Sequence, residues 1–452
     1  MSGFPESELK LIDMTIRMFT EPTLRLDDAL MVDRLEHVRA QKKQLLSTLM
    51  ERLECPTEED VRKKLASNPQ FAQLLRDAGV DPPMKTSPTT GKPTYALAKN
   101  DEAFLALQEH DDPHIQQLCA VRLGTKSTIE ESRIERFIGI GERNKGALPI
   151  PLKYYGAHTG RWSGSDGVNL QNLPSRDKDK KALKNAIVPP EGFTIVNCDS
   201  SQIEARVLAW WAGQTDVVEQ FASGQDVYSL FASKIYGKPI SKANPVERFV
   251  GKTCILGLGY GTGAEKLRHT LKTSPPGADL SVETCKQYVD TYRNVNYAIV
   301  DLWRECDLAL KAMMNGVDRP FYIGHTDCVQ VTREGIRLPN GLYIRYPGLR
   351  MEDGKMVYSS RRGVNNIWGG VVVENVVQAL ARIVVGEQMV ALSDIGLQPV
   401  LTVHDAAVCL VPDEHTEEGV ALITKVMSTA PEWASGLPVA CEAKHGRSYG
   451  EC

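Results

Sequence analysis

Two aspartates that lie far apart in the sequence each border a run of apolar and β-branched residues. Asp199 follows such a run in TIVNCDSSQIEAR, and Asp405 separates two runs in VLTVHDAAVCLV. These runs predict strands, so both carboxylates fall at strand ends, where one sheet could bring them together. Paired carboxylates could hold two divalent ions for in-line phosphoryl transfer, and oxygen ligands of this kind suit Mg²⁺. Taken singly, Asp199 is better explained as a polar residue at a strand end and Asp405 as an ordinary turn residue.

The residues after Asp199 predict a helix. Apolar residues recur there at helical spacing and form one buried face: Ile203, Val207, Trp210 and Trp211. Asp199 therefore lies at a corner between a strand and a helix. Ser201 and Glu204 also fit a capping box at the start of this helix, which would give them a structural role without any catalytic one.

A second predicted helix carries side chains suited to a polyphosphate. In ERFVGKTCILGLGYGTG, four residues recur at intervals of four and stay on one helix face: Arg248, Lys252, Leu256 and Tyr260. The arginine would bind phosphate as a planar fork and the lysine as a point charge, while the apolar and aromatic end would suit a base or a sugar. An amphipathic helix with a solvated basic end explains the pattern equally well.

A stretch rich in amide side chains precedes the first aspartate. HTGRWSGSDGVNLQNLP contains donors of the kind that contact base edges in the minor groove or the sugar–phosphate backbone: Arg161, Asn169, Gln171 and Asn172. A surface loop of this composition would be ordinary by itself. The basic run from Arg176 to Lys184 lies just beyond it, which favours contact with a nucleic acid.

The elements that must position these side chains follow from the apolar pattern of the chain. Residues 1 to about 77 and about 101 to 142 have the periodicity of helices, with a Pro- and Gly-rich loop between them. Further helices are predicted at about 202–222, 226–236, 245–258, 281–315 and 372–393. A β-hairpin region precedes the last of these, and PVLTVHDAAVCLVP predicts two strands joined by a tight turn.

Composition limits the class of protein. The 452 residues suffice for two or three subdomains, and 53 Lys and Arg against 57 Asp and Glu leave a net charge of −4, so any contact with nucleic acid must be local. Ten cysteines without a C-x-x-C pair argue against a zinc site or a disulfide framework. The polar N-terminus is no signal peptide, and no apolar run matches a membrane span. We expect a soluble cytoplasmic protein.

In this order, the segments resemble the family A DNA polymerases, the bacterial polymerase I type. DSSQIEAR is similar to motif A, D-Y-S-Q-I-E-L-R, and VHDAAV to motif C, V-H-D-E. RFVGKTCILGLGYG resembles motif B, R-x-x-x-K-x-x-x-F-x-x-x-Y-G, and TGRWSGSDGVNLQNLP resembles the stretch between thumb and palm, T-G-R-L-S-S-x-x-P-N-L-Q-N-I-P. YYGAHTGRWSG, GLGYGTGAEK and ENVVQALAR look most like bacteriophage members.

The resemblance implies catalysis with two metal ions. Asp199 and Asp405 would be the catalytic, metal-binding carboxylates, and Ser200 would add a backbone carbonyl. One Mg²⁺ would lower the pKa of the primer 3′-hydroxyl and the other would stabilise the leaving pyrophosphate, and Mn²⁺ could substitute. Lys252 would be the general acid for that leaving group.

The resemblance also implies how the substrates are held. Residues that would bind the incoming nucleotide are Ser200, Gln202, Glu204, Arg248, Leu256 and Tyr260. Among them, Glu204 would reject a 2′-hydroxyl, and Tyr260 would lie near the templating base. Residues that would bind the DNA are Arg161, Asn169, Gln171, Asn172, Lys184, Gln378 and His404.

The implied fold is α+β and shaped like a right hand, with a helical thumb, helical fingers and an antiparallel-sheet palm. The thumb would span 1–150, the palm 151–205 and 371–452, and the fingers with connecting hairpins 206–370. The implied function is that of a DNA-directed DNA polymerase in DNA replication. It would be a monomer that acts on primer–template DNA and deoxynucleoside triphosphates and has no membrane partner. The alternative is a primer–template-binding protein with weakened or lost catalysis.

Four positions depart from the family pattern. Ser200 replaces a tyrosine that would pack near the sugar gate, and Leu256 replaces an aromatic residue that abuts the sugar. Glu374 stands where Asn is common, although Asn375 could substitute. Ala406 replaces an acid, from which we expect weaker metal binding or a lower rate.

Relatives usually carry a 3′–5′ exonuclease domain ahead of the thumb. ELKLIDMTIRMFTEP resembles the tail of such a domain. We therefore predict that this chain lacks 3′–5′ exonuclease activity.

Overall fold

A four-stranded antiparallel sheet positions the two aspartates. The computed structural model describes residues 4–87, 92–99, 101–124, 129–173, 181–274, 276–360 and 363–452. The spatial order of the sheet is β15 (Pro399–Val403), β16 (Ala406–Pro412), β7 (Phe193–Ser200) and β17 (Cys441–Gly446). The central strand β7 pairs with β16 and β17, and the register sets Ala406 and Glu442 on either side of Asp199.

The two faces of this sheet differ because successive side chains of a strand point to opposite sides. The residues of β7 on one face are buried: Thr194, Val196, Cys198 and Ser200. Helix α17 (Thr416–Met427) packs on this side, where the Sγ atom of Cys441 lies 3.5 Å from the carbonyl oxygen of Thr424. Asp199 alternates with these residues and lies on the opposite face, which is buried at Ile195 but open at the end that carries Asp199.

Helix α16 (Gly369–Asp394) connects the palm to the rest of the molecule. It contacts α1 (Glu6–Thr20), α9 (Ile203–Ala212), α15 (Tyr297–Asn315) and α17. By length and composition α16 could cross a membrane, but 83% of its apolar window is buried inside the protein. Its apolar character is therefore accounted for by packing in the core.

Helices form most of the fingers: α10 (Thr215–Ala222), α11 (Val227–Tyr236), α12 (Pro245–Leu258), α13 (Ala264–Thr273), α14 (Val282–Val295) and α15. The predicted helices over 226–236 and 245–258 are confirmed. The single helices predicted over 202–222 and 281–315 are wrong, because Gly213, with φ of 72°, ends α9 and Asn296 separates α14 from α15. Helix α13 was not predicted.

The hairpin region predicted before α16 is confirmed as two small antiparallel sheets. Their strands are β8 (Phe321–Tyr322), β9 (Gln330–Thr332), β10 (Gly335–Arg337), β11 (Tyr343–Ile344), β12 (Arg350–Glu352), β13 (Lys355–Ser360) and β14 (Gly363–Asn366). Two-stranded pairs elsewhere join β1 (Arg25–Leu26) to β6 (Ile187–Val188), β2 (Met84–Thr86) to β3 (Pro93–Tyr95), and β4 (Leu152–Lys153) to β5 (Ser163–Gly164).

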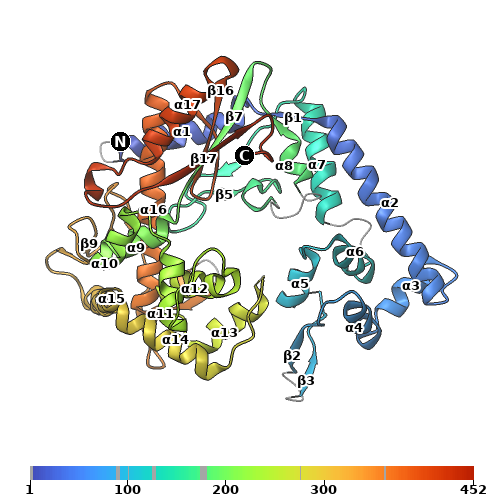
Figure 1. Ribbon diagram of the computed structural model, residues 1–452, viewed down its shortest axis with the longest axis horizontal. Coiled ribbons are helices and arrows are strands. Elements are labelled where there is room, and N and C mark those ends of the chain that lie inside the picture. The colour runs from blue at the N-terminus through green and yellow to red at the C-terminus, as the bar shows by residue number, and fades with distance from the viewer. Residues whose placement is uncertain are drawn as a thin grey trace.

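The N-terminal helices form a separate lobe, which lies on the right of Figure 1, apart from the fingers. They are α2 (Asp28–Arg52), α3 (Glu58–Leu65), α4 (Asn68–Asp77), α5 (Glu102–Gln108), α6 (Pro113–Arg122) and α7 (Ile129–Arg143). Their outer part has its own apolar core, which includes Phe71, Phe104 and Ile115. Helix α2 is tied to α7 by ion pairs from Arg34 to Glu130, at 2.7 Å, and from Lys42 to Glu131, at 3.2 Å.

Helix α1 belongs to the predicted thumb range but packs on the palm. Its Leu11, Met14 and Met18 share an apolar core with Met389 of α16 and with strands of the palm sheet. Glu8 of α1 forms an ion pair with Arg382 of α16, and both side chains are almost fully buried. The first helix therefore holds the base of the palm, whereas α2 to α7 form the lobe beside it.

Candidate active site

The sheet brings the two predicted metal-binding aspartates together. Asp405 occupies the tight turn between β15 and β16, as predicted, and Asp199 is the penultimate residue of the neighbouring strand β7. The backbone N–H of Ser200 donates to the carbonyl oxygen of Asp405 at 3.1 Å. Because this bond joins the strand end to the turn, both carboxylates lie at one edge of the sheet.

The charges around Asp199 favour binding of a cation. Burial raises the pKa of the Asp199 carboxyl, and the negative charges of Asp405 and Glu442 raise it further. His404 and Lys444 oppose this rise in the pKa. Like charges held this close repel each other, so a bound cation would relieve the repulsion between them.

Glu442 is a carboxylate that the sequence analysis missed. It is the direct cross-strand partner of Asp199 on β17, so the two side chains share the open face of the sheet. On the other side of Asp199 stands Ala406, where relatives have an acid. Only the alternation in CEAKHG could have signalled a strand here, and its pairing with β7 is not visible in the sequence.

Glu204 belongs to a hydrogen-bonded cluster beside the edge of the sheet that carries the two aspartates. The Nη2 atom of Arg161 donates to the Glu204 carboxylate and, at 3.2 Å, to Oδ1 of Asp405. The hydroxyl of Tyr260 donates to the other Glu204 oxygen at 3.3 Å. Burial raises the pKa of Glu204, partly opposed by the positive charge of Arg161. Two predicted site residues, Arg161 and Tyr260, therefore contact the carboxylate of a third, Glu204.

The capping box predicted from Ser201 and Glu204 is wrong. The N-cap of α9 is Gln202, which has φ of 55° and makes no side-chain capping bond. The backbone N–H of Ser201 instead donates to the carbonyl oxygen of Ala440 at 2.8 Å. Glu204 is thus available for interactions across the site, because its carboxylate does not cap its own helix.

The side chain of Ser200 points away from the edge that carries Asp199. This side chain is 3% exposed and lies on the sheet face opposite Asp199, beside Cys441. Only the backbone of Ser200 adjoins the metal-binding edge.

Helix α12 presents the predicted basic face toward α11. The guanidinium of Arg248 forms a two-pronged ion pair with Asp226, at 2.6 and 3.2 Å, and lies 5.5 Å from the centre of the Tyr228 ring. The Nζ atom of Lys252 lies 6.0 Å from the same ring. Leu256, on the same face, is 41% exposed. Asp226 and Tyr228, in QDVYSLF, were not predicted as site residues.

Gln171 supports the turn that carries Asp405. Its Oε1 atom accepts from the backbone N–H of His404 at 2.9 Å, and its Nε2 donates to the carbonyl oxygen of Thr402 at 3.3 Å. Asn169 in turn accepts from the backbone N–H of Gln171 at 3.1 Å, capping the short helix η1 (Leu170–Asn172). The amide-rich stretch therefore holds the active-site turn, whatever else it contacts.

Other residues predicted to bind DNA are spread around the site. His404 is exposed with φ of 52°, and Nε2 of Gln378 lies 3.4 Å from Oε1 of Glu374. Asn375 is buried and donates to the Tyr346 hydroxyl at 3.1 Å, so it does not take the place of Glu374 as predicted. Nζ of Lys184 lies 4.9 Å from the centre of the Tyr449 ring. Residues 176–180 of the basic run, and the side chain of Asn172, lie outside the described part.

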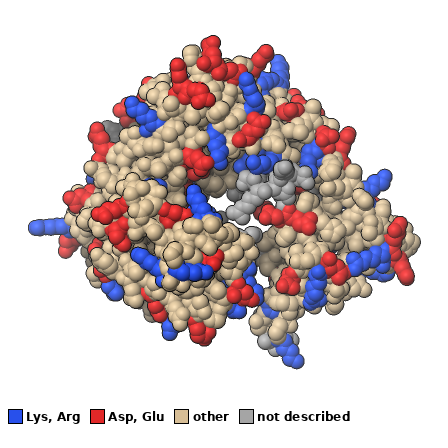
Figure 2. Space-filling model, in the orientation of Figure 1, with Lys and Arg blue, Asp and Glu red and all other residues tan. Residues whose placement is uncertain are grey.

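Figure 2 shows the molecule hollowed between its lobes, with both basic and acidic side chains around the opening. The mixed charge at this rim agrees with the net charge of −4. The prediction from composition, that any contact with a polyanion is local, stays a prediction.

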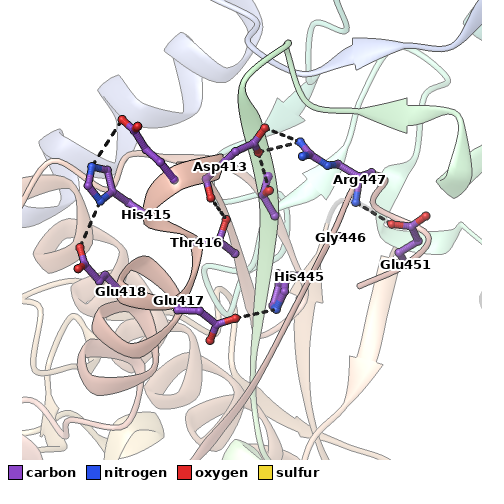
Figure 3. Close-up of a pocket in the computed structure, with 11 residues that line it drawn as sticks. Asp413, His415, Thr416, Glu417, Glu418, His445, Gly446, Arg447 and Glu451 are labelled. Atoms are coloured by element: carbon purple, nitrogen blue, oxygen red, sulfur yellow. Dashed lines mark hydrogen bonds and ion pairs between the residues drawn. The ribbon is translucent and has the colours of Figure 1, made fainter.

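A second cavity, of about 660 Å³, lies at the other end of the sheet (Figure 3). Its charged side chains pair with one another: Arg447 Nη1 donates to both carboxylate oxygens of Asp413 at 2.7 Å, and His415 lies 3.3 Å from Glu418. None of the predicted site residues lines it. It is therefore separate from the edge that carries Asp199.

Comparison with known proteins agrees with this geometry. The sequence pattern described as DNA polymerase family A matches residues 33–451. The DNA polymerase of Bacillus phage SP02 is 29% identical over 336 residues, which cover 64% of this chain and 51% of the phage protein. The thermostable DNA polymerase I of Thermus aquaticus is 26% identical over 363 residues, or 80% of this chain and 39% of that protein. The chain thus spans about half the length of these relatives, or less.

A solved structure shares the fold. The polymerase domain of Pol1 from M. smegmatis, in complex with DNA primer–template and dNTP, aligns with a TM-score of 0.65 at 20% identity. The alignment covers 98% of this chain and 70% of that one. The family pattern and the shared fold extend over nearly the whole polypeptide. This chain therefore belongs to DNA polymerase family A.

Proposed function

We propose that this chain is a template-directed DNA polymerase that adds deoxynucleotides to a primer 3′-hydroxyl and releases pyrophosphate. The observation that carries the proposal is the meeting of Asp199 and Asp405 at one edge of the palm sheet, beside Glu204. The similar M. smegmatis domain was solved with primer–template and dNTP, which supports the same partners here.

Two Mg²⁺ ions are part of the proposal, with Mn²⁺ as a substitute. The site fits such ions in the chemistry of its donors: two carboxylates and the Ser200 carbonyl offer oxygen atoms alone, which Mg²⁺ prefers. Burial and the charge of Asp405 raise the pKa of Asp199, and a bound cation would offset this rise. When bound, the ions would activate the 3′-hydroxyl and stabilise the leaving pyrophosphate.

The residues of the chain would bind and orient the substrates. Arg248 and Lys252 would hold the triphosphate, and Lys252 would donate a proton to the pyrophosphate. Arg248 would first have to exchange its ion pair with Asp226 for phosphate oxygens. Arg161 and Tyr260 hold Glu204 from two sides, which supports its role as a rigid barrier to a 2′-hydroxyl.

Primer extension with Mg²⁺ and deoxynucleotides tests the proposal. Wild type should extend a primer on a template, and Asp199→Ala or Asp405→Ala should lower the rate by several orders of magnitude. Glu414→Ala is the matched control, because this exposed carboxylate lies at the far end of the sheet. Equal rates for all four proteins would exclude the two aspartates as the catalytic pair.

The alternative of a primer–template-binding protein without catalysis is favoured by Ala406, which leaves Asp199 without an acid on one side. The same assay separates the two functions. Tight primer–template binding by wild type, without extension in Mg²⁺ or Mn²⁺, would establish the alternative.

We also propose that the polypeptide as given has no 3′–5′ exonuclease activity. In support, a polymerase domain alone accounts for 98% of the chain in the structural alignment. A primer with a mismatched terminus should stay intact when incubated with Mg²⁺ and no nucleotides. Removal of the mismatched nucleotide, at a rate that Asp199→Ala does not change, would contradict this proposal.

A further inference from the structure

Trp368 differs from the other five tryptophans in its exposure. Four of them are buried, and Trp433 is half-buried, whereas Trp368 is 37% exposed. It immediately precedes α16 and is its N-cap residue, where it makes no capping bond. An indole with this much exposed surface is accessible to a ligand.

The indole is nevertheless held rigidly. Its ring fills the space that side chains at Gly261 and Gly370 would need, since an added Cβ would come within 2.0 and 2.2 Å of it. It also packs edge-on against Trp303, with ring centres 6.0 Å apart at 75°. Trp303 is fixed in turn, because its Nε1 donates to the carbonyl oxygen of Gly259 at 2.8 Å. A ring fixed in this way loses little entropy when a ligand stacks on it.

The place of the indole connects it with the active site. Gly259 and Gly261 flank Tyr260 at the end of the fingers helix, and the hydroxyl of Tyr260 donates to Glu204. The exposed ring therefore lies beside Gly261, the neighbour of Tyr260, and the side chain of Tyr260 contacts Glu204, the proposed sugar gate. Aromatic faces bind unpaired bases of any sequence by stacking, which suits a polymerase that must copy every template.

We propose that Trp368 is the stacking platform for the unpaired template base one position 5′ of the templating base. The inference rests on the proposed function and adds a template-positioning residue to it. Stacking there would keep the next template base out of the nascent pair site until the primer has moved forward by one nucleotide. Gly261 and Gly370 would be required because their lack of a side chain makes room for the ring.

The test measures primer–template affinity without nucleotide, by fluorescence anisotropy, so it does not depend on catalysis. One template carries a base at the position 5′ of the templating base, and the other an abasic nucleotide there. Trp368→Leu should weaken binding of the first template by about fivefold or more, the range of stacking on aromatic side chains, and leave binding of the second unchanged. Trp368→Phe should retain most of the affinity.

Trp433→Leu is the matched control. Trp433 packs edge-on against Trp210, with ring centres 6.2 Å apart at 66°, but it contacts Glu387 far along α16. This variant should bind both templates as wild type does. Equal losses on both templates for Trp368→Leu, or no loss on either, would show that Trp368 only packs and would overturn the inference.

If Trp368→Leu does not fold, the wild type allows a second binding measurement. Moving the abasic nucleotide along the template should weaken wild-type binding most at the position 5′ of the templating base. Trp368→Phe should reduce that difference only in part, because its smaller ring still stacks. Equal effects at all positions would also overturn the inference. Failure of the proposed function is distinguishable, because a wild type that binds no primer–template would fail before any variant is compared.

Discussion

At the scale of single residues, the site contains side chains whose present partners differ from those they would have with substrates. Arg248 is bound by Asp226, and Arg161 is shared between Glu204 and Asp405. Burial by itself would raise the pKa of Asp226, but the hydrogen bond and charge of Arg248 outweigh it and lower that pKa. Asp226 therefore stays ionised and competes with a triphosphate for Arg248.

Asp226→Asn should strengthen binding of the incoming nucleotide. Asparagine keeps the capping role that Asp226 has at α11 but removes its negative charge. A half-exposed ion pair of this kind contributes about 0.2–1 kcal/mol, so the KM for deoxynucleotides should fall by up to about fivefold. Steady-state primer extension measures this KM. Asp279→Asn, which breaks the exposed ion pair with Lys272 elsewhere in the fingers, should leave this KM unchanged. A higher KM for Asp226→Asn would contradict the idea that Asp226 competes with the triphosphate for Arg248.

Ala406→Glu should lower the Mg²⁺ concentration needed for half-maximal rate. Position 406 faces Asp199 directly across the strands, so a carboxylate there would join the metal-binding edge. Because Ala406 is 3% exposed, the new charge should also destabilise the metal-free protein. Thermal unfolding with and without Mg²⁺ checks both effects, and the stabilisation by Mg²⁺ should be larger for the variant. An unchanged Mg²⁺ dependence would show that this position does not tune the metals.

At the scale of secondary structure elements, α1 and α16 are joined by a buried ion pair. Glu8 accepts hydrogen bonds from Arg382, from the Tyr154 hydroxyl and, at 2.6 Å, from Asn340. This carboxylate thus links the first helix to α16 and to the hairpin region. The same two helices share an exposed ion pair from Lys10 to Asp394, at 3.0 Å.

Glu8→Ala should lower the free energy of unfolding by about 3–5 kcal/mol, because it leaves the Arg382 charge buried without its partner. Asp394→Asn, which breaks the exposed pair, should cost at most about 1 kcal/mol. Denaturant unfolding of wild type and both variants measures the difference. Similar small losses for both variants would mean that the buried pair does not hold α1 on the palm.

The Glu8 pair should also make stability depend on pH. Burial alone would raise the pKa of Glu8, but the hydrogen bonds and charge of Arg382 outweigh it, and the pKa is lowered from the ordinary value of 4.5. The stabilisation is therefore fully present above that value and is lost as the pH falls through the lower pKa of the folded state. The gap in stability between wild type and Glu8→Ala should narrow accordingly in acid.

At the scale of the whole molecule, the net charge predicts that DNA would be bound through local contacts. The net charge is −4, yet the predicted DNA contacts are basic or amide side chains. Affinity for primer–template should consequently fall as salt rises, because cations are released from the DNA on binding.

Lys184→Ala should reduce the slope of log affinity against log salt concentration by about 1, the change expected when one phosphate contact is lost. Burial lowers the pKa of Lys184, and its ammonium lies over the Tyr449 ring, so it is held in a defined place. Anisotropy titrations at several salt concentrations check this. Lys425→Ala, on α17 behind the sheet, should leave the slope unchanged.

Local patterns in the sequence sufficed for the strands around Asp199 and Asp405, the helices α11 and α12, and the basic face of α12. They failed where a single residue redirects the backbone, as Gly213 and Gln202 do with positive φ. They also failed for α9, where Glu204 was predicted as a possible cap but instead contacts the distant residues Arg161 and Tyr260.

The sequence by itself determined the family, the order of the motifs and the identities of the two aspartates, because these depend on residue type and spacing along the chain. Tertiary structure alone decided which groups surround them. Three examples are contacts between residues that are not neighbours in the sequence. Glu442 pairs with Asp199, Asp226 forms an ion pair with Arg248, and Trp368 packs against Gly261 and Gly370. Strand register and helix packing set such contacts, and neither is encoded in the spacing of any one segment.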